Sequence, residues 1–174
     1  MKKRFIYIID IILFIVLVYL DQLSKSVAVS KLKDHSAFVI WDKVFEFNYL
    51  ENRGAAFGML QNQKIFFVFV ALIFMLAIVY VLAKCPSEKR YYSLHILLVS
   101  ICAGALGNMI DRLNHDYVVD FIYFKLINFP IFNVADIYVT VSTFILIIMI
   151  LFVYRDTDFE FISFKKSGIK EIRK

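Results

Sequence analysis

The run FIYIIDIILFIVLVYL, residues 5–20, is apolar or aromatic at every position except Asp10. A helix rises about 1.5 Å per residue, so about 20 such residues cross the hydrocarbon core of a bilayer. Three more runs of this kind follow, at residues 65–83, 92–110 and 135–153. The sequence therefore predicts an all-α membrane protein with four transmembrane helices. We expect Asp10 to face another helix or the inner headgroups.

The composition agrees with a bilayer environment. Of the 174 residues, 61% are hydrophobic and only 20% are charged, which is too apolar for an ordinary soluble domain. The net charge of +5 would suggest a nucleic-acid partner in a soluble protein, but here the basic residues flank the apolar runs. We therefore expect membrane lipids and no nucleic acid as partners. Cys85 and Cys102 are too few for a disulfide framework and are expected to be free thiols.

The distribution of lysine and arginine predicts the orientation. Twelve of the twenty lie before residue 5, between the second and third runs, or after residue 153. By the positive-inside rule these three regions are cytoplasmic, which places both termini inside. The first run also resembles a signal peptide, with Ser26-Val27-Ala28 as a possible cleavage site. We expect it to remain as the first span, because its removal would leave three crossings.

The segments between the runs divide the chain further. We expect a transmembrane domain over residues 1–155, with outer segments at 21–64 and 111–134, and a basic, loosely ordered cytoplasmic tail at 156–174. Residues 37–40, 44–49 and 117–124 are rich in β-forming side chains. These runs predict a small extracytoplasmic β-rich cradle at the membrane surface.

Five polar clusters fall at the same depth, three at the outer ends of spans and two in the outer segments between them. Ionisable groups at the hydrocarbon boundary are costly unless they are paired or functional, so together they predict a site at the outer leaflet. In a simpler interpretation each only anchors a helix end: Asp21 and Lys25 would form an ion pair, and Asn133 and Asp136 would cap the fourth span. The clusters are DQLSK (21–25), ENRGAAFG (51–58), GNMIDR (107–112), VVDF (118–121) and FNVAD (132–136).

Carboxylates are the chemical groups best suited to act there. The histidines and cysteines have no metal-ligand spacing, and no serine lies in a nucleophile motif. Asp111, Asp120 and Asp136 remain. Two aspartates held close together share one proton, and such a pair can drive water onto an amide carbonyl. The residues thus favour a metal-free aspartic peptidase, without indicating which two aspartates form the pair.

Glycines are concentrated in or beside the same clusters. Small residues at Gly104 and Gly107 would let another helix approach closely, which is the role we expect for Gly104. Gly54 is expected to leave backbone groups free for a ligand.

The five ordered motifs resemble the lipoprotein signal peptidases, the bacterial signal peptidase II family. The resemblance implies a monomeric enzyme of the bacterial cytoplasmic membrane, with its active site at the outer leaflet and no cofactor. It implies cleavage of prolipoproteins on the N-terminal side of a diacylglyceryl-modified cysteine, with Asp120 and Asp136 as the catalytic pair. It also implies substrate-binding or site-supporting roles for Asp21, Lys25, Asn52, Gly54, Asn108, Asp111, Arg112 and Asn133.

The residues also permit two other functions. A small proton- or cation-coupled transporter subunit would place ionisable residues at the bilayer midplane, whereas Asp10 is the only clearly intramembrane acid. A structural subunit that docks another helix through Gly104 and Gly107 would tolerate Asp→Asn changes.

Overall fold

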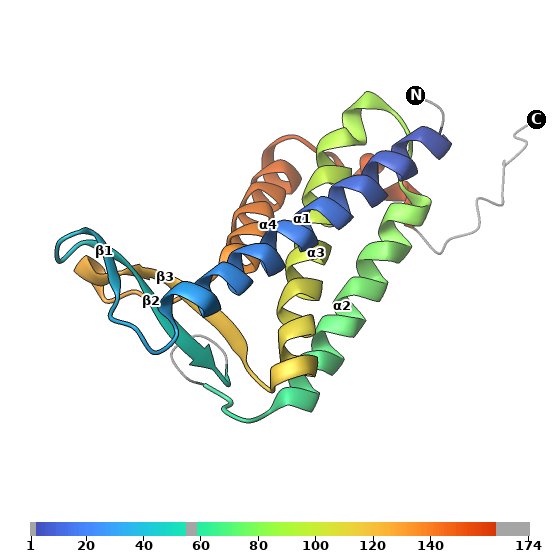
Figure 1. Cartoon of the computed structure of the whole chain (residues 1–174). Coiled ribbons are helices and arrows are strands. Elements are labelled where there is room, and N and C mark those ends of the chain that lie inside the picture. Colours follow the sequence, from blue (N-terminus) through green and yellow to red (C-terminus); the bar gives the residue numbers. More distant parts are fainter. Residues whose placement is uncertain (1–2, 55–58, 163–174) are drawn as a thin grey trace, which may run out of the picture.

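The computed structural model of the chain describes residues 3–54 and 59–162. Its four long helices are α1 (Lys3–Leu32), α2 (Lys64–Lys84), α3 (Tyr92–His115) and α4 (Val134–Phe152). Each is long and apolar enough to cross a membrane. Helix α3 packs against the other three, and half of its apolar window is buried, against 11% for each of the others (Figure 1). The predicted set of four transmembrane-length helices is confirmed.

Helix α1 is longer than the sequence indicated. The first outer segment was expected to begin at residue 21, but the helix continues to Leu32. The extension is stabilised by packing, because Ala28 and Leu32 are buried against Val119 and Phe121 of the sheet. As a result the polar residues 21–25 lie well inside a helix and not at its end.

The predicted β-rich element is a three-stranded antiparallel sheet in the order β1 (Phe38–Trp41), β2 (Phe45–Asn52), β3 (Val118–Phe124). It lies beside the end of α1 (Figure 1). Asn52 pairs with Val118 across β2 and β3, so its diagonal neighbour on the same face is Asp120. The sheet register therefore brings an amide next to a carboxylate.

The opposite end of the bundle is held by polar and aromatic contacts. Residues 156–162, expected to be loosely ordered, form a short 3-10 helix, η4 (Asp156–Ile162), and Asp158 pairs with Arg90 ahead of α3.

Asp10 faces another helix, as predicted, and its Oδ2 lies 2.7 Å from Nδ1 of His95 on α3. The free thiols Cys85 and Cys102 are both buried, which confirms that prediction. Residues 163–174 of the expected tail lie outside the described residues.

Gly104 lies at a close contact between α3 and α4. A Cβ added there would lie 2.5 Å from the carbonyl oxygen of Ala135 and 2.8 Å from Cγ2 of Val139, which confirms its expected role in helix packing. We expect Gly104→Ala to lower the free energy of unfolding by about 1–3 kcal/mol, because backbone cannot yield to the new methyl group. Thermal unfolding in detergent would measure the loss. An unchanged melting temperature would show that α3 and α4 can move apart to accommodate the methyl group without loss of stability.

Candidate active site

A buried lysine connects α1 to α3. The ammonium of Lys25 lies 2.9 Å from Oδ2 of Asp21, 3.1 Å from Oδ2 of Asp111 and 2.9 Å from Oδ1 of Asn108. An ammonium has three N–H donors, so all three are used. Lys25, Asp21 and Asp111 are each at most 3% exposed. The ion pair expected between Asp21 and Lys25 is present. It belongs to a larger group with Asn108 and Asp111, which we call the lysine cluster.

The two carboxylates of this cluster also fix the backbone of distant segments. Oδ1 of Asp21 accepts the N–H of Ala135 at 2.9 Å, and Oδ2 of Asp111 accepts the N–H of Val119 at 3.0 Å. Each of these amides belongs to the residue just before one of the two candidate catalytic aspartates. The lysine cluster therefore positions the start of α4 and the strand β3 together.

Gln22 belongs to the same cluster, although the sequence did not single it out as a site residue. Its side-chain N–H groups lie 3.1 Å from Oδ2 of Asp21, 3.0 Å from Oδ1 of Asp111 and 3.1 Å from the carbonyl oxygen of Gly107. Any Cβ at Gly107 would collide with the Asp21 carboxylate. A usable signal was present, because residues 22 and 25 lie on the same face of a helix.

Two asparagine amides are held with their N–H₂ groups toward the candidate aspartates. Oδ1 of Asn52 accepts the Gly54 N–H at 2.9 Å, so its Nδ2 donates to Oδ2 of Asp120 at 2.8 Å. Oδ1 of Asn108 faces the buried ammonium, which can only donate, so its Nδ2 donates to Oδ1 of Asp136 at 2.8 Å. In each asparagine, a donor bound to Oδ1 turns the N–H₂ group toward the aspartate: the Gly54 N–H for Asn52 and the Lys25 ammonium for Asn108.

Asn133 has two roles at the start of α4. It forms a capping box with Asp136, in which Oδ1 of Asn133 accepts the Asp136 N–H at 3.0 Å and Oδ2 of Asp136 accepts the Asn133 N–H at 3.1 Å. Its Nδ2 donates to Oδ1 of Asp120 at 2.6 Å and to Oδ1 of Asn108 at 3.1 Å. The simpler interpretation as a helix cap is correct, and the same side chain also links the two aspartates.

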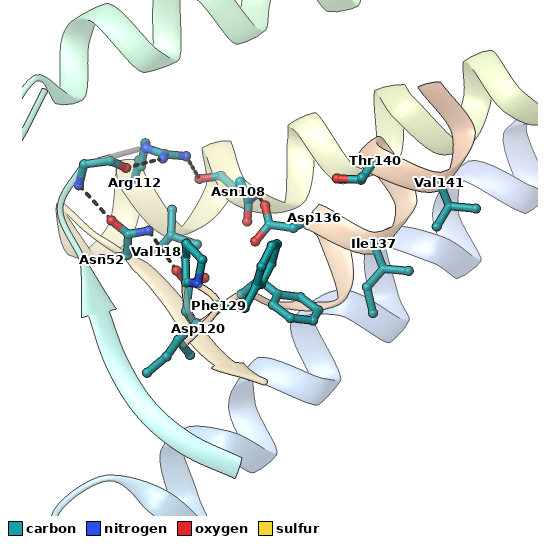
Figure 2. Close-up of a pocket in the computed structure, with 14 residues that line it drawn as sticks. Asn52, Asn108, Arg112, Val118, Asp120, Phe129, Asp136, Ile137, Thr140 and Val141 are labelled. Carbon is teal, nitrogen blue, oxygen red and sulfur yellow. Dashed lines mark hydrogen bonds between the residues drawn. The ribbon is translucent and has the colours of Figure 1, made fainter. Parts of the chain in front are cut away.

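Asp120 and Asp136 line one cavity of about 490 Å³ (Figure 2). Asp111, which the residues alone could not separate from these two, is instead held in the lysine cluster. The segment 129–132 and one face of α4 form apolar walls that the sequence did not indicate. The other lining residues are Asn52, Gly54, Asn108, Arg112, Val118, Phe129, Pro130, Ile131, Phe132, Ile137, Thr140 and Val141.

The pKa of Asp120 is raised to about 7, mainly by burial and also by the neighbouring negative charge of Asp136. Hydrogen bonds from Asn52 and Asn133 oppose the shift by favouring the charged form. A carboxyl group with this pKa is about half protonated at neutral pH, whereas an ordinary aspartate is ionised, so it can serve as a general acid.

Arg112 closes the polar end of the cavity. Its Nη2 donates to the carbonyl oxygen of Gly54 at 3.2 Å, its Nη1 donates to that of Asn108 at 3.3 Å, and the guanidinium lies 4.6 Å from the Phe67 ring centre. The expectation that Gly54 leaves its backbone free for a ligand is wrong, because its N–H is bonded to Asn52 and its C=O to Arg112. Gly54 instead orients two side chains of the cavity.

The described part of the chain contains no cluster of three or more His, Cys, Asp or Glu side chains that could hold a metal ion. The polar side chains that line the cavity are the carboxylates of Asp120 and Asp136, the amides of Asn52 and Asn108, the Arg112 guanidinium and the Thr140 hydroxyl. This set can move protons and bind polar groups of a substrate.

Four membrane-length helices and two aspartates that line one cavity fit an aspartic peptidase of the membrane. Residues 13–152 match the family described as signal peptidase (SPase) II. The chain belongs to the signal peptidase II family.

Relatives and solved structures agree. The chain is 43% identical over 142 residues to the lipoprotein signal peptidase of Clostridioides difficile (strain 630), covering 82% of this chain and 94% of the relative. It is 39% identical over 151 residues to that of Streptococcus pneumoniae (strain ATCC BAA-255 / R6), covering 87% and 95%. A bacterial membrane enzyme solved by the in meso method at 2.3 Å superposes with a TM-score of 0.72 at 29% identity, covering 91% and 94%.

Proposed function

We propose that this chain hydrolyses the peptide bond on the N-terminal side of a diacylglyceryl-modified cysteine in prolipoproteins, with Asp120 and Asp136 acting together on a water molecule. Membership of the signal peptidase II family supports removal of signal peptides from prolipoproteins. The observation that carries the mechanism is that both carboxylates line one cavity and are joined through Asn133.

The two aspartates differ in ways that suggest different roles. Asp120 is 2% exposed, and its raised pKa of about 7 favours the protonated form. Asp136 occupies the N3 position of α4, where the helix dipole and the Asn133 N–H stabilise negative charge. We therefore assign the resting proton to Asp120 and the resting charge to Asp136.

From this state the reaction follows the usual course for a carboxylate pair. Ionised Asp136 takes a proton from water, the hydroxide oxygen bonds to the scissile carbonyl carbon, and Asp120 gives its proton to the carbonyl oxygen. The tetrahedral intermediate then collapses, the C–N bond breaks, and Asp136 returns its proton to the leaving nitrogen. Asp120 regains its proton from the second hydroxyl group as the new carboxyl forms.

We also propose how the chain sits in the bilayer and reaches its substrate. The sheet lies at the end of the bundle opposite to the basic connection between α2 and α3 (Figure 1). By the positive-inside rule this supports a cavity at the outer leaflet and both termini in the cytoplasm. The substrate enters sideways between the helices, with its lipid chains in the bilayer. The enzyme acts as a monomer.

The direct test uses purified protein in detergent and a precursor with a diacylglyceryl-cysteine. We expect two products, separated immediately before the modified cysteine, by mass spectrometry. A chelator should not alter the rate, and the same precursor without the lipid serves as the control for substrate recognition. Absence of cleavage, or a cut elsewhere, would refute the proposed function.

The pH dependence follows from the raised pKa of Asp120. Because the proton needed for the carbonyl oxygen is present below a pKa of about 7 and lost above it, kcat/KM should fall as the pH rises through about 7. The midpoint belongs to the pair and not to one residue. Initial rates between pH 5 and 9 in one detergent would measure this limb, and a rate that rises through that interval would contradict the assignment of the proton to Asp120.

A further inference from the structure

The cavity continues from the aspartates along one face of α4. Ile137, Thr140 and Val141 follow Asp136 on this helix and line the same cavity (Figure 2). Ile137 and Val141 are 39% and 49% exposed, on a helix long and apolar enough to cross the membrane. The cavity therefore opens from a polar end toward the hydrocarbon.

Thr140 is the polar side chain in this apolar part. Threonine and serine within a membrane helix commonly bond to a carbonyl one turn earlier, as Ser100 does to Ile96 at 2.8 Å. The exposed Thr140 hydroxyl forms no hydrogen bond with any residue that the structure describes. Because a hydroxyl in an apolar environment is costly without a partner, this group is available to a ligand.

This step rests on the proposed function, in which the substrate is a diacylglyceryl-modified prolipoprotein. The ester carbonyls of its diacylglyceryl group are hydrogen-bond acceptors at the membrane depth of Thr140. Thr140 lies one helical turn, about 6 Å, from Asp136 in the direction of the bilayer centre. The glyceryl ester carbonyls lie several bonds beyond the scissile peptide, on the side where the acyl chains enter the bilayer. Carbonyls of a helical signal peptide bond within their own helix, whereas ester carbonyls have no internal donor.

We propose that the Thr140 hydroxyl donates a hydrogen bond to an ester carbonyl of the substrate's diacylglyceryl group, while the acyl chains lie along Ile137 and Val141. Thr140 is a positioning residue in this arrangement. It holds the lipid so that the adjacent peptide bond lies between the aspartates, and it takes no part in proton transfer.

The test combines an isosteric substitution with a matched pair of substrates. Thr140→Val should raise KM for a diacylglyceryl precursor about three- to ten-fold with kcat nearly unchanged, the effect of one hydrogen bond. Thr140→Ser should restore the KM. A dialkylglyceryl precursor has ether links and no ester carbonyl. For this substrate the unaltered enzyme should already show the raised KM expected of Thr140→Val with the ester substrate. Thr140→Val should not increase that KM further. Thr143→Val, on the same helix and outside the cavity lining, is the control.

An unchanged KM for the ester substrate would overturn the proposal. So would an equal increase for the ester and ether substrates, since the hydroxyl would then act on the protein or on a bilayer lipid. Binding of a fluorescent diacylglyceryl-cysteine peptide, with and without Thr140→Val, gives a readout that does not need cleavage. If Thr140→Val lowers the affinity only for the ester-linked peptide, the proposal is supported, even if no precursor is cleaved. Absence of cleavage would count against the proposed function alone. Equal affinity of the unaltered enzyme and Thr140→Val for the ester-linked peptide overturns the proposal.

Discussion

Asp136→Asn is expected to abolish processing of a lipidated precursor while the protein still accumulates in the membrane. An amide has nearly the same shape as a carboxyl group but cannot take a proton from water, so we expect kcat to fall by about 10³-fold or more. Asp120→Asn should do the same, because it removes the proton for the carbonyl oxygen. Reconstituted enzyme with a diacylglyceryl precursor would measure both losses.

Asp42→Asn is the matched control, since Asp42 is exposed in the turn between β1 and β2 and lies outside the cavity lining. It should retain full activity. Activity kept by either of the other two variants would remove that residue from the pair. A purely structural role for the chain would predict that all three variants behave alike.

Lys25→Met should have the second largest effect. The substitution removes the cation that bridges Asp21 and Asp111, and breaking a buried ion pair in this way lowers the free energy of unfolding by about 3–5 kcal/mol. Activity should fall as well, because the same ammonium orients the Asn108 amide. Thermal unfolding in detergent and the amount of protein in the membrane would measure the effect.

Lys31→Met is the control for this change, because Lys31 is exposed on the same helix. It should leave the melting temperature within about 1 °C of the unaltered protein, in line with surface substitutions. Equal losses in the two variants would show that the buried cluster does not stabilise the fold.

Much of the fold could be predicted because the bilayer limits the choices. Apolar runs of spanning length give the helices, and alternating β-forming residues near Phe45 and Val118 give the strands. How far α1 continues past its apolar run could not be predicted from residues 21–32 alone. They are helical because Ala28 and Leu32 pack against a sheet that forms from distant segments.

For the candidate site, the sequence indicated which polar residues come together but not how they connect. The backbone N–H groups of Val119 and Ala135 are essential partners of Asp111 and Asp21, yet every residue but proline has such a group. The same limit applies to Phe129, whose place in the cavity wall depends on how the chain turns after β3. Side-chain chemistry can be read from a sequence, whereas backbone partners require the fold.

The central claim is that Asp120 holds a proton beside ionised Asp136, and infrared difference spectroscopy of the purified protein tests it most directly. At pH 6 we expect the band of a protonated carboxylic acid that is missing in Asp120→Asn and that titrates near pH 7. In Asp136→Asn the midpoint should move to lower pH, because the neighbouring negative charge is gone. A spectrum without this band at pH 6, or a midpoint that Asp136→Asn leaves in place, would contradict the account.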